Sequence, residues 1–466
     1  MNVLLTHAYY LNEDPRELLI MKPYVPLGIL YIAAFLEKNN IQVNVFDTTF
    51  STFNDQCQLL IKDPPLIIGV YVNLMTRLNV IRLIRFIKNE KTLSHTKIIL
   101  GGPEVKHSAE NFLNAGADFI ITGEGEETML ELSSAIISNE SDFSNIKSIV
   151  YANGSGYTHT MERQNVRDIN LLPIPAREKV DLQKYFDVWK ERHGQSAVSV
   201  NTMRGCPYTC KWCSRAVYGQ SYRRRSPELV VEELEWIHAN YDVDTIWFVD
   251  DVFTISHKWL SAFNEIIQQK KLRIRFECIT RADRMNEDVI NLLKQSGCFR
   301  VWIGAESGSQ KIIDAMDRRV KVTQVREMIQ KTMHAGMEAG TFIMVGYPGE
   351  TETDLVETLQ HLKLSNPDQY TITVAYPIKG TPLYAETVSS FIDAPDWDKG
   401  TDRQIDFKRT YSRSYYNYAV RWMANEVALH KNRLSKGPFD KRIKHLLKSA
   451  AARGVMTLYR LQAGKS

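Results

Sequence analysis

The sequence contains no apolar run that approaches the roughly 18 residues of a membrane-spanning helix. Its first residues, Met1-Asn2-Val3-Leu4-Leu5, lack the basic region and the cleavage site of a signal peptide. The net charge of +4 is too small to indicate binding to nucleic acid. No short internal repeat or low-complexity tract is present. These absences together predict a cytoplasmic protein that does not bind nucleic acid.

Cysteine is also scarce. Six cysteines in 466 residues are too few for a disulfide scaffold. Three of them fall within eight residues, as Cys206, Cys210 and Cys213, and such clustering indicates a metal site. The other three stand alone and are expected to be small buried apolar residues: Cys57, Cys278 and Cys298.

The composition that remains is that of an ordinary globular protein, with 44% apolar and 24% charged residues. A chain of 466 residues is longer than one hydrophobic core supports, so two or three domains are expected.

Residues 1–140 alternate short β-branched runs with amphipathic helical stretches. This pattern is typical of a parallel sheet covered by helices. The predicted strands are 3–7, 43–47, 67–72, 97–100 and 119–122, and the predicted helices are 27–38, 78–88, 108–115 and 126–137. Five such units indicate an α/β fold with a doubly wound, Rossmann-like sheet, whose ligands bind at the carboxyl ends of the strands.

The rest of the chain divides into three further parts. Residues 141–194 are interpreted as a connector with a hairpin, whose strands are 149–152 and 157–160. In residues 195–390 the βα alternation resumes, with strands near 197–202, 245–249, 273–279, 300–304, 338–345 and 370–375. Six βα units predict a partial (βα)6 barrel. No strand is predicted after Tyr384, and residues 391–466 are expected to form a helical region with helices over 406–430 and 439–461.

The cysteine cluster lies on the loop after the first barrel strand, at spacings of four and three. Three thiolate ligands leave one iron of a cubane cluster open, and an open iron can bind a substrate. The alternative is a structural zinc site, which requires a fourth Cys or His at a suitable spacing. His193 and His238 fit no usual zinc-finger spacing.

The CxxxCxxC pattern, with Trp212 before its last cysteine, resembles that of the radical S-adenosylmethionine superfamily. The resemblance implies a [4Fe–4S] cluster on Cys206, Cys210 and Cys213 that binds the amino and carboxylate groups of S-adenosylmethionine. It further implies a one-electron cleavage that yields methionine and a 5′-deoxyadenosyl radical, which abstracts hydrogen from the substrate. Tyr208 and Trp212 are then expected beside the S-adenosylmethionine.

Later strand ends carry the other residues that the resemblance places near S-adenosylmethionine. Asp250 and Asp251 stand where a Gly-Gly-Glu motif accepts the ammonium group, unless one of them only caps the next helix. Arg281 is expected to pair with the carboxylate, and Glu306 to bind the ribose hydroxyls. The adenine is expected along a glycine-rich stretch, although packing or turn geometry could also explain its glycines. The residues expected there are Gly340, Ile343 and Gly346.

A doubly wound domain ahead of such a barrel resembles the cobalamin-binding branch of this superfamily, and the two resemblances together cover roughly residues 1–390. The matching stretches are 23–31, 101–104 and 123–127. The resemblance implies a corrin that lies across the strand ends, where small residues allow close approach. The residues expected at the cobalamin are Thr6, His7, Leu27, Gly28, Asp47, Thr48, Tyr71, Asn73, Leu74, Met75, Gly101, Gly102, Pro103, Glu104, Gly123, Glu124 and Gly125.

One position departs from the common cobalamin pattern, Asp-x-His-x-x-Gly, whose histidine binds cobalt from below. Here the second strand ends Asp47-Thr48-Thr49-Phe50, without a histidine. The lower face of cobalt is then left to water or to an apolar side chain, with Asn73, Leu74 and Met75 beneath the corrin. A degenerate domain that binds no cobalamin is the alternative.

The resemblance leaves two reactions open. The first is a cobalamin-dependent radical methyl transfer to carbon, in which a second S-adenosylmethionine remethylates cobalt. The second is a cyclisation or rearrangement without methyl transfer, as in the anaerobic magnesium-protoporphyrin monomethyl ester cyclase. A methylthiotransferase would need further cysteines in the N-terminal domain, which has only Cys57, and an electron-transfer protein would not cleave S-adenosylmethionine. A small-molecule substrate and an external electron donor such as flavodoxin or ferredoxin are expected.

Residues 431–466 carry ten Lys or Arg and the single acid Asp440. An approximately helical apolar stripe runs through them, formed by Ile443, Leu446, Leu447, Ala450, Val455 and Leu458. One interpretation is a helix packed against the barrel with a solvated basic face. The other is a basic amphipathic helix that contacts an anionic membrane surface, which would suit a lipid or pigment substrate.

Overall fold

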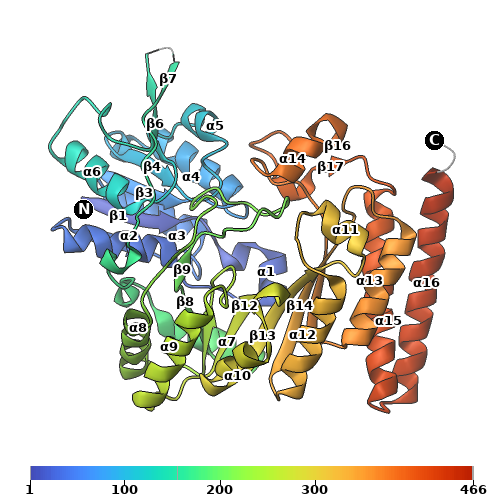
Figure 1. The fold of residues 1–466 in the computed structure, drawn as a ribbon. Coiled ribbons are helices and arrows are strands. Elements are labelled where there is room, and N and C mark those ends of the chain that lie inside the picture. The colour runs from blue at the N-terminus through green and yellow to red at the C-terminus, as the bar shows by residue number, and fades with distance from the viewer. Residues whose placement is uncertain (1, 155, 464–466) are drawn as a thin grey trace. The chain divides into compact units, whose positions relative to one another are not determined.

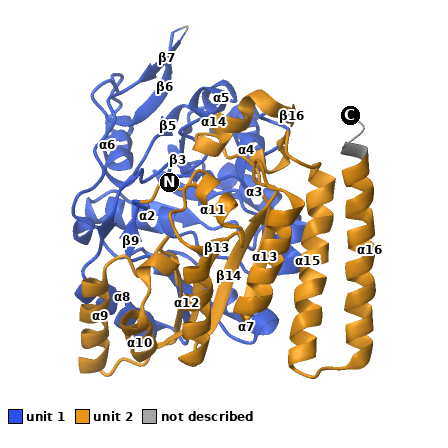
Figure 2. Cartoon of the chain, turned by 45° about the vertical axis from the view of Figure 1, so that its right-hand side comes forward, with its two compact units in different colours: residues 1–207, 214–247, 395–401 blue, residues 208–213, 248–394, 402–466 orange. Residues whose placement is uncertain are grey.

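A computed structural model describes residues 2–154 and 156–463 of the chain (Figure 1). They form two compact units, which Figure 2 distinguishes by colour. Unit 1 consists of residues 1–207, 214–247 and 395–401, and unit 2 of residues 208–213, 248–394 and 402–466.

The N-terminal sheet of unit 1 has seven strands in the order β2-β1-β3-β4-β5-β6-β7. They are β1 (Val3–His7), β2 (Val43–Phe46), β3 (Ile67–Tyr71), β4 (Lys97–Gly101), β5 (Phe119–Ile121), β6 (Ile149–Asn153) and β7 (Gly156–His159). The first five pair in parallel, which confirms the predicted α/β class and doubly wound sheet. The predicted hairpin forms part of this sheet, because β6 pairs antiparallel with β5.

Both faces of this sheet are buried, as expected when crossover helices join parallel strands. Successive side chains of a strand point to opposite faces, so Leu4 packs in one core, and Val3 and Leu5 in the other. The helices of this region are α1 (Pro15–Ile20), α2 (Leu27–Lys38), α3 (Phe53–Lys62), α4 (Arg77–Asn89), α5 (Ala109–Asn114) and α6 (Glu126–Ile137). Residues of α4 and α5 cover the first face, and residues of α2 and α6 cover the second. Helices α1 and α3 have no counterpart in the sequence prediction.

A second sheet has six strands in the order β15-β14-β13-β12-β11-β8, the arrangement of a half-barrel. They are β8 (Ala197–Val200), β11 (Thr245–Phe248), β12 (Phe276–Thr280), β13 (Cys298–Glu306), β14 (Glu338–Val345) and β15 (Gln369–Val374). The pairs from β12 to β15 are parallel. The six predicted barrel strands are therefore confirmed, with ends that differ by up to three residues.

Helices alternate with these strands. They are α7 (Leu182–His193), α8 (Pro227–Asn240), α9 (His257–Gln269), α10 (Glu287–Gln295), α11 (Gln310–Ala315), α12 (Val322–His334), α13 (Glu352–Ser365) and α14 (Pro382–Thr387). Between β8 and α8 the short strands β9 (Met203–Arg204) and β10 (Arg223–Arg224) pair antiparallel.

The C-terminal part of unit 2 is helical, as predicted. α15 (Arg413–Leu434) and α16 (Phe439–Ala463) lie side by side in both views (Figures 1 and 2). The prediction that strands stop after Tyr384 is wrong, because β16 (Phe391–Asp393) and β17 (Asp406–Phe407) form a small antiparallel ribbon. For the same reason the helix predicted from residue 406 begins only at Arg413.

Candidate active site

The predicted cluster loop is preceded by Gly205, and the local geometry requires a glycine at this position. β9 pairs with β10 immediately before Cys206, so the chain ahead of the loop lies close to residues 221–224. Gly205 has a φ of +83°, and a Cβ atom there would lie 2.7 Å from the carbonyl oxygen of Ser221. Only glycine adopts this conformation and allows this approach without strain.

The three predicted cluster ligands differ in exposure. Cys210 is buried, and Cys206 and Cys213 are half-buried. Cys206 belongs to unit 1, whereas Cys210 and Cys213 belong to unit 2. Within the residues that the structure describes, no three His, Cys, Asp or Glu side chains are arranged as a metal site. The assignment of the cluster to these cysteines rests on their spacing and stays a prediction. The three isolated cysteines are buried, as predicted: Cys57, Cys278 and Cys298.

Two arginines of unit 2 point at the sulfur of Cys210. Nη1 of Arg281 lies 3.6 Å from Sγ, and Nη1 of Arg318 lies 3.9 Å from it. All three side chains are buried. Two cationic N–H donors beside one buried sulfur suit a thiolate, the form of cysteine that binds iron. The surroundings of Cys210 therefore fit a cluster ligand.

Arg281 is held in place by several partners, all within unit 2. Its Nε donates to Oδ1 of Asp283 at 2.8 Å, and its Nη2 donates to the carbonyl oxygen of Arg318 at 2.6 Å. The guanidinium carbon lies 3.8 Å from the centre of the Tyr208 ring, within cation–π range. These contacts fix the plane of the guanidinium beside the cluster loop. Whether it also pairs with the carboxylate of S-adenosylmethionine stays a prediction.

Glu306 ends β13 in a conformation that side chains rarely adopt. Its φ is +66°, and the register between β13 and β14 shifts between Gly304 and Glu306. Arg318 donates from Nη2 to the carbonyl oxygen of Gly304 at 2.6 Å and places Nη1 3.6 Å from Oε1 of Glu306. Burial raises the pKa of Glu306, and Arg318 and Arg281 oppose this rise. A strained backbone at a half-buried carboxylate is a frequent sign of a functional residue.

The two predicted acceptors for the ammonium group lie in the loop after β11, where they have different environments. Asp250 is only 1% exposed, whereas Asp251 is exposed. Behind them Phe248 and Phe253 stack at 4.7 Å in an aromatic cluster, which fixes both ends of the short loop. A buried carboxylate has strong interactions with a cation because little water screens it, so Asp250 is the better placed of the two.

Packing and turn geometry account for two residues of the glycine-rich stretch. A Cβ atom on Gly340 would lie 2.5 Å from the ring of Trp302, which stacks on Phe342. Gly346 has a φ of +78°, and its N–H donates to Oε2 of Glu350 at 2.5 Å. Ile343 is buried within β14. These observations fit the alternative that the sequence left open, and adenine contacts stay a prediction.

In unit 1, two glycines near the ring of Tyr71, at the carboxyl ends of the strands, have free space at their Cβ positions. A Cβ atom on Gly28 would come no closer than 3.8 Å to this ring, and nothing lies within 4 Å of the Cβ position of Gly101. Gly102 has a φ of +114° and turns tightly after β4. Burial raises the pKa of Tyr71 to about 12, so its hydroxyl stays protonated and polar. The open positions leave space that a flat ligand could fill.

Most residues predicted at this edge are exposed or half-buried, as a ligand site requires. They are Leu27, Gly28, Asp47, Tyr71, Asn73, Leu74, Met75, Gly101, Gly102, Pro103, Glu104, Gly123 and Gly125. The remaining four are buried: Thr6, His7, Thr48 and Glu124.

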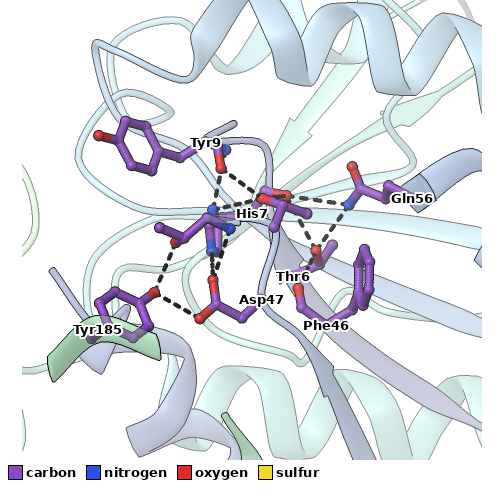
Figure 3. A network of polar contacts seen from close by, with 9 residues as sticks. Thr6, His7, Tyr9, Phe46, Asp47, Gln56 and Tyr185 are labelled. Carbon is purple, nitrogen blue, oxygen red and sulfur yellow. Dashed lines mark hydrogen bonds and ion pairs between the residues drawn. The ribbon is translucent and has the colours of Figure 1, made fainter. Parts of the chain in front are cut away.

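A network of hydrogen bonds joins several of these residues at the ends of β1 and β2 (Figure 3). Nε2 of His7 lies 2.9 Å from Oδ1 of Asp47, and the hydroxyl of Tyr185 donates to Oδ2 of Asp47 at 2.7 Å. Thr6 donates to the carbonyl oxygen of Phe46 at 2.7 Å, and Thr48 donates to backbone oxygens of the same region. Burial by itself raises the pKa of Asp47, but the hydrogen bonds from His7 and Tyr185 lower it to about 2.

Three other predicted cobalamin residues have structural partners. Oδ1 of Asn73 accepts from the N–H groups of residues 75 and 76 and so orders the start of α4. Glu104 pairs with Arg77 at 2.5 Å. Glu124 pairs with Arg204 at 3.2 Å and with Arg223 at 2.8 Å. These contacts position the loops at the strand ends, and direct contact with a cofactor stays a prediction.

The sequence analysis missed residues that complete these arrangements. Arg318 contacts Cys210, Gly304 and Glu306, but it belongs to no recognised motif. Tyr185 contacts Asp47 from α7, far along the chain. Arg204 could have been noticed, since it stands two residues before Cys206.

Comparison with known proteins gives one family match in the region of each large sheet. Residues 200–362 match the model of the radical SAM superfamily, and residues 21–133 match that of the B12 binding domain. An uncharacterized methyltransferase of Pyrococcus horikoshii is 27% identical over 383 residues, which are 81% of each chain. The anaerobic magnesium-protoporphyrin IX monomethyl ester cyclase of Synechocystis sp. is 25% identical over 390 residues, 80% of this chain and 75% of the relative.

A solved structure shares the fold. The cobalamin-dependent S-adenosylmethionine radical enzyme OxsB, with aqua-cobalamin and S-adenosylmethionine bound, gives a TM-score of 0.74 at 18% identity, over 98% of this chain and 71% of that one. The two family matches follow each other along the chain in the order of the N-terminal sheet and the half-barrel. The chain therefore belongs to the B12-binding radical S-adenosylmethionine enzymes.

Proposed function

We propose that this enzyme transfers a methyl group to an unactivated carbon of a small or hydrophobic molecule, using a [4Fe–4S] cluster, S-adenosylmethionine and cobalamin. The proposal is carried by the arrangement around Cys210, where two buried guanidinium groups face one sulfur of the three-cysteine loop. The B12 binding domain ahead of the half-barrel supports the use of cobalamin, and the P. horikoshii relative named as a methyltransferase supports the reaction type.

When bound, the cluster would supply the electron that cleaves S-adenosylmethionine, and cobalamin would carry the methyl group. Cys206, Cys210 and Cys213 would hold the cluster, with Arg281 and Arg318 compensating negative charge on its sulfur ligand. An external one-electron donor of the flavodoxin or ferredoxin type would reduce it.

The residues of unit 2 would bind and orient S-adenosylmethionine. The buried Asp250 carboxylate would accept the ammonium group, and Glu306 would accept hydrogen bonds from the ribose hydroxyls. Arg318 would favour the ionised form of Glu306, since its guanidinium opposes the rise that burial causes in the pKa of that carboxyl. A site in which the reacting atoms are fixed and water is excluded protects a radical from side reactions.

In unit 1 the open positions around Tyr71 would accommodate the corrin. The His7 and Asp47 side chains would support this edge from within, because they bind each other and Tyr185. Both nitrogens of His7 are engaged, so neither is available as a cobalt ligand. Asn73, Leu74 and Met75, which are half-buried at the same edge, would contact the bound corrin.

A reaction without methyl transfer is the second candidate, favoured by the likeness to the Synechocystis cyclase over 80% of this chain. The two candidates leave different products. Methyl transfer yields S-adenosylhomocysteine together with 5′-deoxyadenosine, and the substrate gains one CH₂. Cyclisation or rearrangement yields 5′-deoxyadenosine without S-adenosylhomocysteine, and the product loses hydrogen, gains oxygen or keeps its mass.

The test is anaerobic incubation of the protein, reconstituted with iron, sulfide and cobalamin, with S-adenosylmethionine, a strong reductant and a metabolite extract. Mass spectrometry then measures both nucleosides and searches for products that carry a deuterated methyl group from labelled S-adenosylmethionine. The C213A variant serves as the control. Label in a new product supports methyl transfer, and 5′-deoxyadenosine alone supports the second candidate. If the reconstituted protein forms neither nucleoside, both are wrong.

A further inference from the structure

Helix α16 turns its large apolar side chains to solvent. Phe439 is 72% exposed, Leu447 64%, Leu458 61% and Leu461 59%. Ile443 and Leu446 are exposed as well. At about 100° per residue, positions 443, 447, 450, 454, 458 and 461 share one face of a helix. The described part of α16 thus carries a continuous outward stripe of apolar residues, here called the outer stripe, over most of its length.

The opposite face of α16 holds the helix on α15. Ala452 and Met456 are buried there, and Ser449 donates to Oε1 of Glu426 at 2.6 Å. His445 lies 3.1 Å from Oδ1 of Asn425. The residues that pack α16 are therefore mostly small or polar, and the larger apolar residues are not needed for this packing. The helix therefore packs on its neighbours and exposes basic residues, as the first interpretation expected, but the face that packs is not the apolar stripe.

Basic residues border the outer stripe. Lys441, Lys444 and Lys448 are exposed along one side and make no ion pair among the described residues. On the other side Arg453 and Arg460 pair with Glu352 of α13 and so fix the orientation of the helix. Asp440 is the single acid of α16, against six Lys or Arg. An occupant of this face must therefore be apolar along its centre and negatively charged at its border.

We propose that the outer stripe binds the surface of an anionic lipid bilayer, with α16 lying in the plane of the membrane. The apolar side chains would enter the acyl region, and the three lysines would contact lipid phosphates. No helix in the described part of the chain is long and apolar enough to cross a membrane. The proposal does not depend on methyl transfer, but it would give the enzyme access to hydrophobic substrates.

Charge distinguishes a lipid surface from a second copy of the chain. A second copy carries the same excess of cations on its own α16, six Lys or Arg against one acid, so it would not compensate the lysines that border the outer stripe. An anionic bilayer instead compensates the lysines and covers the stripe. The lipid surface is therefore the occupant that both properties of this face fit.

The experiment is flotation of the full-length protein with vesicles of phosphatidylcholine alone or mixed with phosphatidylglycerol. The wild type is expected to float with the anionic vesicles and much less with the neutral ones, and added salt should weaken its binding. The K441Q/K444Q/K448Q variant is expected to lose about a hundredfold in partitioning, because each of the three lysines contributes about fivefold near an anionic surface. The I443Q/L447Q variant should lose binding at every salt concentration.

Matched controls change exposed residues elsewhere in unit 2. The K258Q/K294Q/K408Q variant alters the net charge equally, and the L364Q/I392Q variant removes two exposed apolar residues from other elements. Both should float like the wild type, and thermal unfolding verifies that every variant is folded. The proposal is overturned if the wild type does not float, or if the controls lose as much binding as the variants of α16. It is also overturned if light scattering shows a dimer that I443Q/L447Q separates and no vesicle binding is found, because a second copy then covers the stripe.

Discussion

His7 and Asp47 form a closed pair at the carboxyl ends of β1 and β2, with Nε2 of His7 2.9 Å from Oδ1 of Asp47. The N–H group of Tyr9 donates to Nδ1 of His7 at 3.1 Å. A nitrogen that accepts an N–H cannot itself be protonated, so the proton of His7 lies on Nε2 and points to Asp47. The hydroxyl of Tyr185 donates to Oδ2 of Asp47 at 2.7 Å. The pair therefore stabilises the edge of the sheet.

This pair predicts how stability depends on pH. The pKa of Asp47 is lowered to about 2 in the folded protein, so its contribution is present above the unfolded value of about 4 and is lost as the pH falls through 2. This shift of nearly two pKa units corresponds to about 2.5 kcal/mol. Between pH 5 and pH 2 the free energy of unfolding should therefore fall in both proteins. We expect the fall to be larger in the wild type than in D47N by about this amount. Urea unfolding at several pH values measures this, and equal slopes for the two proteins would contradict it.

Glu350 predicts the opposite trend at higher pH. Burial raises its pKa to about 8, although the N–H of Gly346 opposes this. The stabilising effect of the neutral acid is complete below the unfolded pKa of about 4.5 and is lost as the pH rises through 8. The E350Q variant keeps a neutral acceptor and has no such titration. Its melting temperature relative to the wild type should therefore rise from pH 5 to pH 8 and level off above pH 9, as differential scanning calorimetry would show.

The three clustered cysteines should be essential individually. Replacement of Cys206, Cys210 or Cys213 by alanine is expected to abolish assembly of the cluster, because two thiolates do not retain an open cubane. Iron per chain and 5′-deoxyadenosine formation should both fall to background. The C57A variant is the control, since that thiol is buried and isolated. Full cleavage activity in any of the three variants would rule out the cluster assignment.

Arg318 should act on S-adenosylmethionine through Glu306. Its loss in R318Q removes the cation 3.6 Å from Oε1 of Glu306, so the pKa of this half-buried carboxyl should rise further. Its proposed hydrogen bonds to the ribose should then weaken. We expect about tenfold weaker binding of S-adenosylmethionine, the effect of one charge-assisted hydrogen bond, with iron content retained. The adjacent R319Q variant, which changes an exposed arginine, should bind normally. Equilibrium dialysis measures both, and equal affinities would place Glu306 outside the site.

The open positions around Tyr71 can be tested by filling one. Gly28 is exposed and its Cβ position is free, so G28E should fold but project a charged side chain into the proposed corrin site. We expect a loss of cobalt per chain with unchanged iron. The G156E variant makes the same change on β7, where nothing lies within 4 Å. Equal cobalt in both variants would mean that the corrin lies elsewhere.

Local sequence patterns were sufficient to predict both sheets, because strand and helix periods depend on neighbouring residues. Val3–His7 and Glu338–Val345 have the predicted bounds. The ribbon of β16 and β17 was not predicted, because strands of two or three residues are too short to show a periodic pattern. Helix α3 was missed as well, although Thr52 and Asp55 form a capping box at its start.

The sequence by itself determined the cluster loop, because its three cysteines lie within one short contiguous segment. Only the tertiary structure brought Arg281 and Arg318 to Cys210, since they stand 71 and 108 residues away from it along the chain. It also decided the outward direction of the apolar stripe of α16. The helical period shows which residues share a face, but α15 packs on Ala452 and Met456 and thereby leaves Ile443 and Leu447 to solvent.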